Sequence, residues 1–173
     1  VGTGVNIWGN GYAASDTVRV NFGTTPSRAV FKTSGVIGYN ETGGAGGTFT
    51  VSFTIDTQIY GTTTIVASGS ILNQATNTLI ILPRIIRVSP NYGTVGTPVT
   101  VSGNGYGYKE RIEVNFGKIP TIAYATSEKY GSWTVIYTID HQPLGTKTIT
   151  GYGLVTGISA VETFIINPKV EFV

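Results

Sequence analysis

The chain has 173 residues, a net charge of +2 at pH 7 and no cysteine, and 40% of its residues are hydrophobic against 12% charged. This balance is typical of an ordered protein rather than a disordered one, and without a basic run it gives no reason to expect a nucleic-acid partner. The lack of cysteine excludes disulfide frameworks and thiolate metal sites, and no apolar run reaches the roughly 18 residues that a membrane-spanning helix needs.

Apolar and polar residues alternate along most of the chain, and we find no helical period. Alternation of this kind predicts strands with one face in a core and the other in solvent, as in antiparallel sheets. The predicted strands include residues 5–7, 18–22, 49–55, 61–67, 78–82, 85–88, 99–101, 112–116, 133–139, 145–151 and 163–166. Turn signals between them recur at roughly the 8–12-residue spacing of a β-sandwich.

Two copies of one pattern occupy residues 1–82 and 95–166. The matched sequences are Val-Gly-Thr at 1 and 95, Gly-Asn-Gly-Tyr at 9 and 103, Asn-Phe-Gly at 21 and 115, Thr-Ile-Asp at 54 and 138, and Gly-Thr at 61 and 145. We therefore predict an all-β protein of two tandem immunoglobulin-like β-sandwich domains, residues 1–82 and 83–167. Pro83, which restricts the backbone, stands where a flexible linker would be.

The two copies differ in what precedes them. Residues 83–90, Pro-Arg-Ile-Ile-Arg-Val-Ser-Pro, stand before the second copy, and a similar segment, residues 168–173, ends the chain. We expect domain 1 to lack its first strand and residues 168–173 to form the first strand of a following or neighbouring domain. Two explanations stay open: the chain is a segment of a longer array, or its last strand completes the first domain of a neighbour.

The stretch from Ile86 to Tyr106 combines a Ser-Pro at 89, a Gly-x-x-Gly turn at 93, an alternating strand and the Gly-Asn-Gly-Tyr at 103. A Val-Asn-Phe-Gly strand follows at 114 and also occurs at 20. This order of motifs resembles the IPT/TIG-type immunoglobulin-like repeat, twice and over nearly the whole chain. The resemblance implies an immunoglobulin-like fold. It also implies, from prokaryotic members, a place in spacers and stalks of surface proteins, adhesins or surface layers, or beside glycan-active enzymes.

The largest difference between the copies is residues 35–46, which Glu128-Lys129-Tyr130 replaces in the second copy. The segment is rich in glycine, and we predict a hairpin tip at the surface. Asn40-Glu41-Thr42 within it is an N-glycosylation sequon, so Asn40 is a candidate for glycosylation.

Two glycine-rich features favour structure over chemistry. Gly103-x-Gly105-x-Gly107 has the spacing of a phosphate loop, but no helix follows that would present its N-terminus to an anion. We expect these glycines to form a strand-to-loop corner. Tyr12 and Tyr106 close the same turn in the two copies, and we expect their rings to be buried with each hydroxyl bonded to the backbone.

No catalytic or metal site is expected. His141 is the only histidine and the nine acidic residues are scattered, whereas calcium takes six to eight oxygen ligands from a cluster. Asp56 and Asp140 end equivalent strands, which favours a role in capping turns. No Ser-His-Asp set and no recurring carboxylate pair can be placed, so we expect neither a cofactor nor an enzymatic activity.

Subunit contacts are expected at the last segment and at two outward apolar side chains. Trp8 lies on the polar side of its strand, where the second copy has Ser102, and Ile136 stands among outward threonines, where the first copy has Ser52. Exposed contiguous apolar surface marks an interface. The alternatives for Trp8 are stacking on a sugar or packing under residues 35–46. The interface residues predicted in the last segment are Pro168, Lys169, Val170, Glu171, Phe172 and Val173.

These features predict a non-enzymatic extracellular structural protein, a subunit or segment of a surface filament, stalk or surface layer joined head to tail by strand complementation. Its partners would be further copies of itself. The alternative is a carbohydrate-binding or adhesive module, in which Trp8 and loops around Tyr39, Tyr60 and Tyr108 hold a cell-surface glycan. A third hypothesis, with less support, is a spacer within a large surface enzyme.

Overall fold

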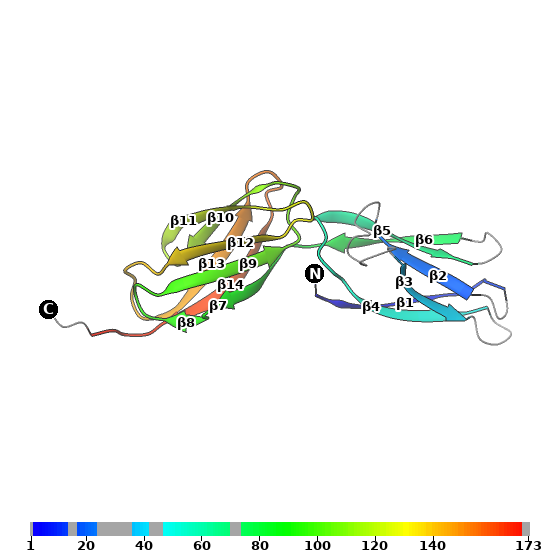
Figure 1. Ribbon diagram of the computed structural model, residues 1–173, viewed down its shortest axis with the longest axis horizontal. Coiled ribbons are helices and arrows are strands. Elements are labelled where there is room, and N and C mark those ends of the chain that lie inside the picture. Colours follow the sequence, from blue (N-terminus) through cyan, green and yellow to red (C-terminus); the bar gives the residue numbers. More distant parts are fainter. Residues whose placement is uncertain (1, 14–16, 24–35, 42–46, 70–73, 171–173) are drawn as a thin grey trace. The chain divides into compact units, whose positions relative to one another are not determined.

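The computed structural model describes residues 2–13, 17–23, 36–41, 47–69 and 74–170, with the backbone alone for residues 17 and 36–41. The chain divides into two compact units, unit 1 (Val1–Ile81) and unit 2 (Leu82–Val173). Every regular element among the described residues is a β-strand, which confirms the predicted all-β class of tandem β-sandwiches (Figure 1). These residues include no helix that is long and apolar enough to cross a membrane.

Unit 2 is a complete sandwich of two sheets. Its strands are β7 (Arg84–Ser89), β8 (Tyr92–Gly93), β9 (Pro98–Asn104), β10 (Arg111–Phe116), β11 (Ile119–Thr126), β12 (Trp133–Thr138), β13 (Gly145–Gly153) and β14 (Ser159–Ile166). One sheet has the order β12-β9-β7 and the other the order β11-β10-β13-β14-β8. Neighbouring strands are antiparallel except β8 and β14, which are parallel.

The described residues of unit 1 repeat most of this arrangement with fewer strands. Its strands are β1 (Gly4–Gly9), β2 (Thr17–Phe22), β3 (Val36–Glu41), β4 (Phe49–Thr54), β5 (Gly61–Ser68) and β6 (Gln74–Ile81). The sheet β3-β2-β5-β6 corresponds to β11-β10-β13-β14 of unit 2, whereas the other sheet contains β1 and β4 alone among the described residues.

The alternating pattern places one hydrophobic core between the two sheets of unit 2. Val99 and Val101 of β9 point into it from one sheet, and Val114 and Phe116 of β10 and Phe164 of β14 from the other. All five side chains are fully buried, and the Phe116 and Phe164 rings meet edge to face with their centroids 5.9 Å apart. The residues between them face solvent, because side chains in a strand alternate between its faces.

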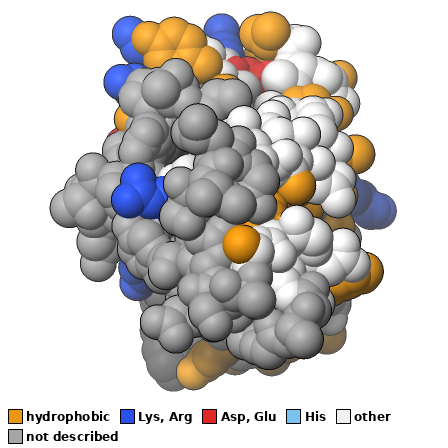
Figure 2. All heavy atoms as spheres, turned by 90° about the vertical axis from the view of Figure 1, so that its right-hand side faces the viewer, with side chains coloured by type: hydrophobic (Ala, Val, Ile, Leu, Met, Phe, Trp, Pro, Cys, Tyr) orange, Lys and Arg blue, Asp and Glu red, His pale blue; other side chains and the backbone are white. Residues whose placement is uncertain are grey.

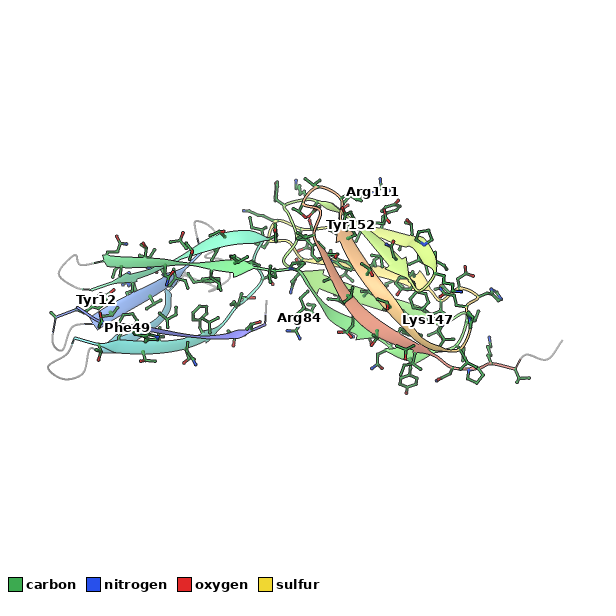
Figure 3. All side chains as sticks on the ribbon, turned by 180° about the vertical axis from the view of Figure 1, so that it is seen from behind. Tyr12, Phe49, Arg84, Arg111, Lys147 and Tyr152 are labelled. Carbon is green, nitrogen blue, oxygen red and sulfur yellow. The ribbon has the colours of Figure 1, made fainter. Side chains whose placement is uncertain are left out.

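A buried tyrosine closes the same corner in each unit, as predicted. The Tyr12 hydroxyl donates a hydrogen bond to the carbonyl oxygen of Ala67 at 3.0 Å, and the Tyr106 hydroxyl donates to that of Gly151 at 2.9 Å. Tyr12 also meets the ring of Phe49 edge-on at 5.3 Å between centroids (Figure 3). Burial raises the pKa of Tyr106 well above its ordinary value, so this hydroxyl stays protonated as a donor.

Glycines form the predicted corner before each tyrosine. Gly11 and Gly105 have φ angles of +83° and +80°, in the left-handed region that glycine adopts without strain. A side chain at Gly105 would also collide with the backbone carbonyl of Leu82. The glycine spacing therefore serves the backbone, which confirms the structural interpretation of this motif.

The prediction of a hairpin tip at residues 35–46 is wrong for residues 36–41. These residues form β3, which pairs with β2 and places Asn40 opposite Val18. The rest of the predicted tip lies outside the described residues. Strand β3 supplies hydrogen-bond partners to this edge of β2, as β11 does for β10. Asn40 thus lies in a strand instead of a loop, and its glycosylation stays a prediction.

A buried carboxylate joins two loops at one end of unit 2. Glu110 is 2% exposed. Its Oε2 accepts a hydrogen bond from Gly107 N at 2.7 Å, and its Oε1 accepts bonds from Val155 N, Thr156 N and Thr156 Oγ1 at 2.6–2.8 Å. Burial raises the pKa of this carboxyl, but the four hydrogen bonds together lower it by more than burial raises it. The pKa of Glu110 therefore lies below the ordinary value of 4.5.

We expect Glu110→Gln to destabilise unit 2 by about 2–3 kcal/mol, because an amide cannot accept all four bonds and leaves buried donors unpaired. Since the folded-state pKa is lowered, the contribution of Glu110 is complete above pH 4.5 and is lost as the pH falls through the lower folded-state value. The variant should therefore show a smaller loss of stability on acidification. Fluorescence of Trp133, which is buried in unit 2, during urea unfolding at several pH values measures this effect.

The matched control is Glu113→Gln, which removes the same charge from a half-buried position on the outer face of β10. It should leave the stability of unit 2 nearly unchanged. Equal effects of the two variants would mean that net charge, not the hydrogen-bonded carboxylate, stabilises the loops.

Candidate functional site at the open edge of β1

Unit 2 shows what a complete small sheet requires. Strand β9 lies between β12 and β7, so both of its edges are paired. Ile85 of β7 is buried in the core, and Val88 of β7 packs against it. Strand β7 therefore supplies two things: backbone partners for one edge of β9, and apolar side chains that cover the core at this edge.

Strand β1 occupies the place of β9 in unit 1, but only one of its edges is paired. It pairs with β4 from Gly4 opposite Thr54 to Gly9 opposite Phe49, and no strand among the described residues lies along its other edge. In an antiparallel pair, half of the backbone N–H and C=O groups point away from the partner. The free edge of β1 therefore presents donors and acceptors to whatever approaches it.

The core side of unit 1 is less well covered at this edge. Val5 and Ile7 of β1 are only partly buried against the core of unit 1, whereas their counterparts Val99 and Val101 are fully buried. The difference agrees with the absence, within the described residues, of a strand equivalent to β7. An apolar side chain added here would be removed from water together with Val5 and Ile7.

Trp8 stands beside this edge on the outer face of β1. It is 75% exposed, which confirms that it lies on the polar side of its strand. Its counterpart Ser102 lies opposite Arg87 of β7 and is hydrogen-bonded to Thr134 at 2.9 Å. Figure 2 shows described hydrophobic side chains at several separate places on the face that it displays. Exposure alone therefore does not mark a site, whereas the open edge singles out Trp8.

Ile136 is also exposed, at 66%, as predicted. It lies in β12 opposite Thr100, and β12 forms the edge of its sheet away from β7. Since Trp8 belongs to unit 1 and Ile136 to unit 2, neither unit carries both residues of the predicted interface.

The predicted donor segment begins directly after β14. Asn167 N donates a hydrogen bond to Gly93 O at 2.7 Å, and residues 168–170 then belong to no strand. Val170 is 84% exposed, and Figure 1 shows the segment leaving the sandwich of unit 2. Glu171, Phe172 and Val173 lie outside the described residues.

A hollow of about 430 Å³ lies at the base of this segment, but its chemistry is poor. His141 on its wall is 92% exposed, and its Nδ1 lies 3.4 Å from Asp140 Oδ1. Asp140 accepts a hydrogen bond from His141 N, and Asp56 accepts one from Thr57 N, both at 2.6 Å, as expected of turn residues. No group of three His, Cys, Asp or Glu side chains among the described residues could hold a metal ion.

The residues proposed for a glycan site are not brought together. Trp8 lies opposite Thr50 near the start of β4, whereas Tyr60 precedes β5, beyond the end of β4. Tyr108 belongs to unit 2, and the side chain of Tyr39 is not among those described. A shared aromatic platform of these four residues is therefore not formed within either unit.

Another aromatic group lies on the outer face of unit 2 and was missed from the sequence. Glu113 of β10 lies between Tyr124 of β11 and Tyr152 of β13, two residues that are 46% and 39% exposed. The guanidinium of Arg111 lies 3.8 Å from the centre of the Tyr124 ring, and Figure 3 labels Arg111 and Tyr152 at the same end of unit 2. Sheet register creates this row, which we name the tyrosine row.

No protein-family model and no curated protein matches the sequence. Among solved structures, the chain is similar to SGBP-B from a complex xyloglucan utilization locus in Bacteroides uniformis, at 21% identity and a TM-score of 0.36, with 95% of this chain and 45% of that chain aligned. It is also similar to the ICAM-5 D1–D4 ectodomain fragment, at 16% identity and a TM-score of 0.39, with 96% and 50% aligned.

A third similar structure is that of the fibronectin(III)-like modules of Clostridium thermocellum CbhA, at 12% identity and a TM-score of 0.29, with 95% of this chain and 85% of that chain aligned. The chain spans half or less of the length of the first two proteins. The likeness is one of fold alone, and the resemblance to IPT/TIG repeats stays a prediction.

We expect β1 to exchange its amide hydrogens faster than β9. Half of the β1 amides face the open edge, while β9 is paired on both sides. Hydrogen exchange followed by mass spectrometry should be done on protein diluted until light scattering gives the mass of one chain, 18.3 kDa. Equal protection of the two strands in that sample would mean that the edge of β1 is already paired within the chain.

Proposed function

We propose that this chain is a non-enzymatic structural module of the cell surface, one link of a filament, stalk or surface layer in which strand complementation joins units head to tail. The observation that supports this function is the open edge of β1 in a chain that also carries a second sequence with the pattern of β7. The edge lacks a β7-like partner among the described residues, and residues 168–170 lie in no strand.

The last segment has the sequence pattern of β7. Residues 83–88 read Pro-Arg-Ile-Ile-Arg-Val and residues 168–173 read Pro-Lys-Val-Glu-Phe-Val. The two apolar residues of β7 that pack on the core, Ile85 and Val88, are three positions apart, because the register shifts between Ile85 and Arg87. Val170 and Val173 have the same spacing, so the segment can present the same two contacts to an open edge.

The energetics of such a joint are finely balanced. Burying Val170, Phe172 and Val173 contributes about 1.5–3 kcal/mol for each side chain. Ordering the six residues of the segment costs about 1–2 kcal/mol per residue. These terms nearly cancel, so the ladder of backbone hydrogen bonds and the contacts of neighbouring side chains decide whether the joint holds.

A joint of this kind links two different surfaces, the tail of one unit and the edge of the next. Contacts between unlike surfaces that do not close into a ring generate open filaments, and addition of a strand to an exposed sheet edge is a known mode of recognition. It also removes an edge that would otherwise promote aggregation. The predicted extracellular location is part of this proposal.

We expect deletion of residues 168–173 to abolish assembly, because the β7-like sequence that completes the edge of β1 in this proposal is then lost. The same result is expected when the six residues are replaced by a Gly/Ser sequence of equal length. Electron microscopy of the purified chain, together with its mass from light scattering, measures assembly. A Val161→Thr variant is the matched control, because Val161 is exposed in β14, in the larger sheet of unit 2. Normal polymers from the truncated protein would contradict the mechanism.

The second candidate function is glycan binding, and the tyrosine row favours it over the residues first considered. Exposed rings two strands apart, about 10 Å by sheet spacing, can stack on the apolar faces of sugar rings. Glu113 between them offers acceptors for sugar hydroxyls. The equivalents of Glu113 and Tyr152 in unit 1 are Arg19 and Ser68, so this site would belong to unit 2.

For this second candidate, we expect Tyr152→Ala to weaken binding to a glycan on an array by about fivefold or more, since a stacked ring is lost. Tyr92→Ala is the matched control, because Tyr92 is exposed in β8 at the far edge of the same sheet. Saturable binding that both variants retain, or no binding by the parent chain, would exclude the tyrosine row as a glycan site.

A further inference from the structure

The pairing of β7 with β9 provides a register that the repeat transfers to β1. The observed pairs are Ile85 with Gly103, Arg87 with Ser102, and Val88 with Val101. Alignment of the two copies makes Gly9, Trp8 and Ile7 the counterparts of these three β9 residues. Alignment of the last segment with β7 makes Val170, Phe172 and Val173 the counterparts of Ile85, Arg87 and Val88.

Resting on the proposed function, we propose that the open edge of β1 takes residues 168–173 of a second copy of this chain in the register of β7 on β9. Phe172 of the donor then lies opposite Trp8 of the acceptor. This aromatic pair on the outer face is the contact that selects the partner.

The inward positions fit this register. Val170 would lie opposite Gly9, as Ile85 lies opposite Gly103. Both glycines leave room for a ring of the neighbouring strand, because a side chain at Gly9 would collide with Phe49 and one at Gly103 with Trp133. The inward apolar residue of the donor thus meets the same kind of surface in both units.

The third pair completes the inward contacts. Val173 would lie opposite Ile7, which is only half-buried although its counterpart Val101 is fully buried. The donor would therefore cover Ile7 in the way that Val88 covers this edge of the core in unit 2. The partial burial of Ile7 therefore identifies the surface that the Val173 side chain of the donor would cover.

The outward position distinguishes the two joints. In unit 2, the pair on the outer face is Arg87 with Ser102, two polar residues. In the transferred register, both members are replaced together, by Phe172 and Trp8. Aromatic pairs directly opposite each other on antiparallel strands stabilise the sheet. One pairing therefore accounts for two aromatic residues, of which Trp8 is 75% exposed.

The occupant follows from the same comparison. The β7 sequence is already paired with β9, so the remaining segment with this pattern is residues 168–173. A β7-like sequence with Arg at the position of Phe172 would leave the ring of Trp8 without an aromatic partner. A second copy of this chain supplies a partner that matches the edge at all three positions.

Disulfide cross-linking tests the register, because the chain contains no cysteine of its own. A Trp8→Cys variant is mixed with a Phe172→Cys variant under mild oxidation, and dimers are counted on a non-reducing gel. We expect cross-linked dimers from this mixture but not from Trp8→Cys with Val173→Cys, because Val88, the counterpart of Val173, packs on the core, whereas Arg87, the counterpart of Phe172, faces solvent. Arg87→Cys with Ser102→Cys in one chain is the positive control for this geometry.

Equal cross-linking at positions 172 and 173, or none at either while the positive control forms its disulfide, would overturn the register. Assembly of the unmodified chain separates the two proposals. If that chain forms filaments without the expected cross-link, the head-to-tail function stands and this pairing fails. If it never assembles and the tail never cross-links, both fail, and a segment preceding β1 becomes the occupant to seek.

A second arm measures the aromatic contact in the otherwise unchanged chain. Trp8→Ser and Phe172→Arg should each weaken self-association by about tenfold. The double variant recreates the Arg87–Ser102 pair and should be no weaker than either single variant. Effects that multiply in the double variant, or no effect of either change, would show that the two side chains do not meet.

Discussion

The backbone of β1 sets the main constraint on this molecule. A strand in the middle of a sheet must pair along both edges. Otherwise its backbone N–H and C=O groups lack hydrogen-bond partners where water is partly excluded. In unit 2, β7 meets this need for β9 and also covers the core with Ile85. In unit 1, the described residues leave the equivalent edge unpaired and Ile7 half-buried. The absence of a β7-like strand from the described part of unit 1 thus accounts for both the open ladder and the incompletely covered core.

Much of the fold could be predicted from two independent signals. The internal repeat shows most strands twice, and the alternation of apolar and polar residues marks each of them as a strand. The strand predicted at residues 133–139 is β12, Trp133–Thr138, and its alternation correctly places Ile136 outside. The two buried tyrosines were predicted because each follows a glycine corner in both copies. Such features are local, and local sequence reports them well.

The rest depended on distances that the sequence does not contain. Glu110 is a charged residue beside a turn, and only the fold brings it to the loop of Thr156, which is 46 positions away. Strand β3 was missed because the extra residues of the first copy were assigned to positions 35–46, which is too late in the alignment of the two copies. Ile37-x-Tyr39 matches Ile122-x-Tyr124, and this signal would have predicted both the strand and one member of the tyrosine row.

Comparison of the two units suggests how a repeat protein keeps its joints distinct. Inward positions of the small sheets agree in kind, since Val99 and Val101 have Val5 and Ile7 as counterparts. Packing restricts these positions, so they cannot tell one donor strand from another. The outward positions touch no core and are free to differ, as Trp8 and Ser102 do.

Selectivity between joints must therefore reside on the outer face. A tethered β7 has a high effective concentration at the edge of β9, and a free tail gains nothing there by placing a phenylalanine opposite Ser102. The edge of β1 offers the reverse, since no described strand competes for it and its outward residue is a tryptophan. In the proposed head-to-tail mechanism, tethering and outward chemistry thus direct a free tail to β1, and each addition presents a new tail, so that growth would continue in one direction.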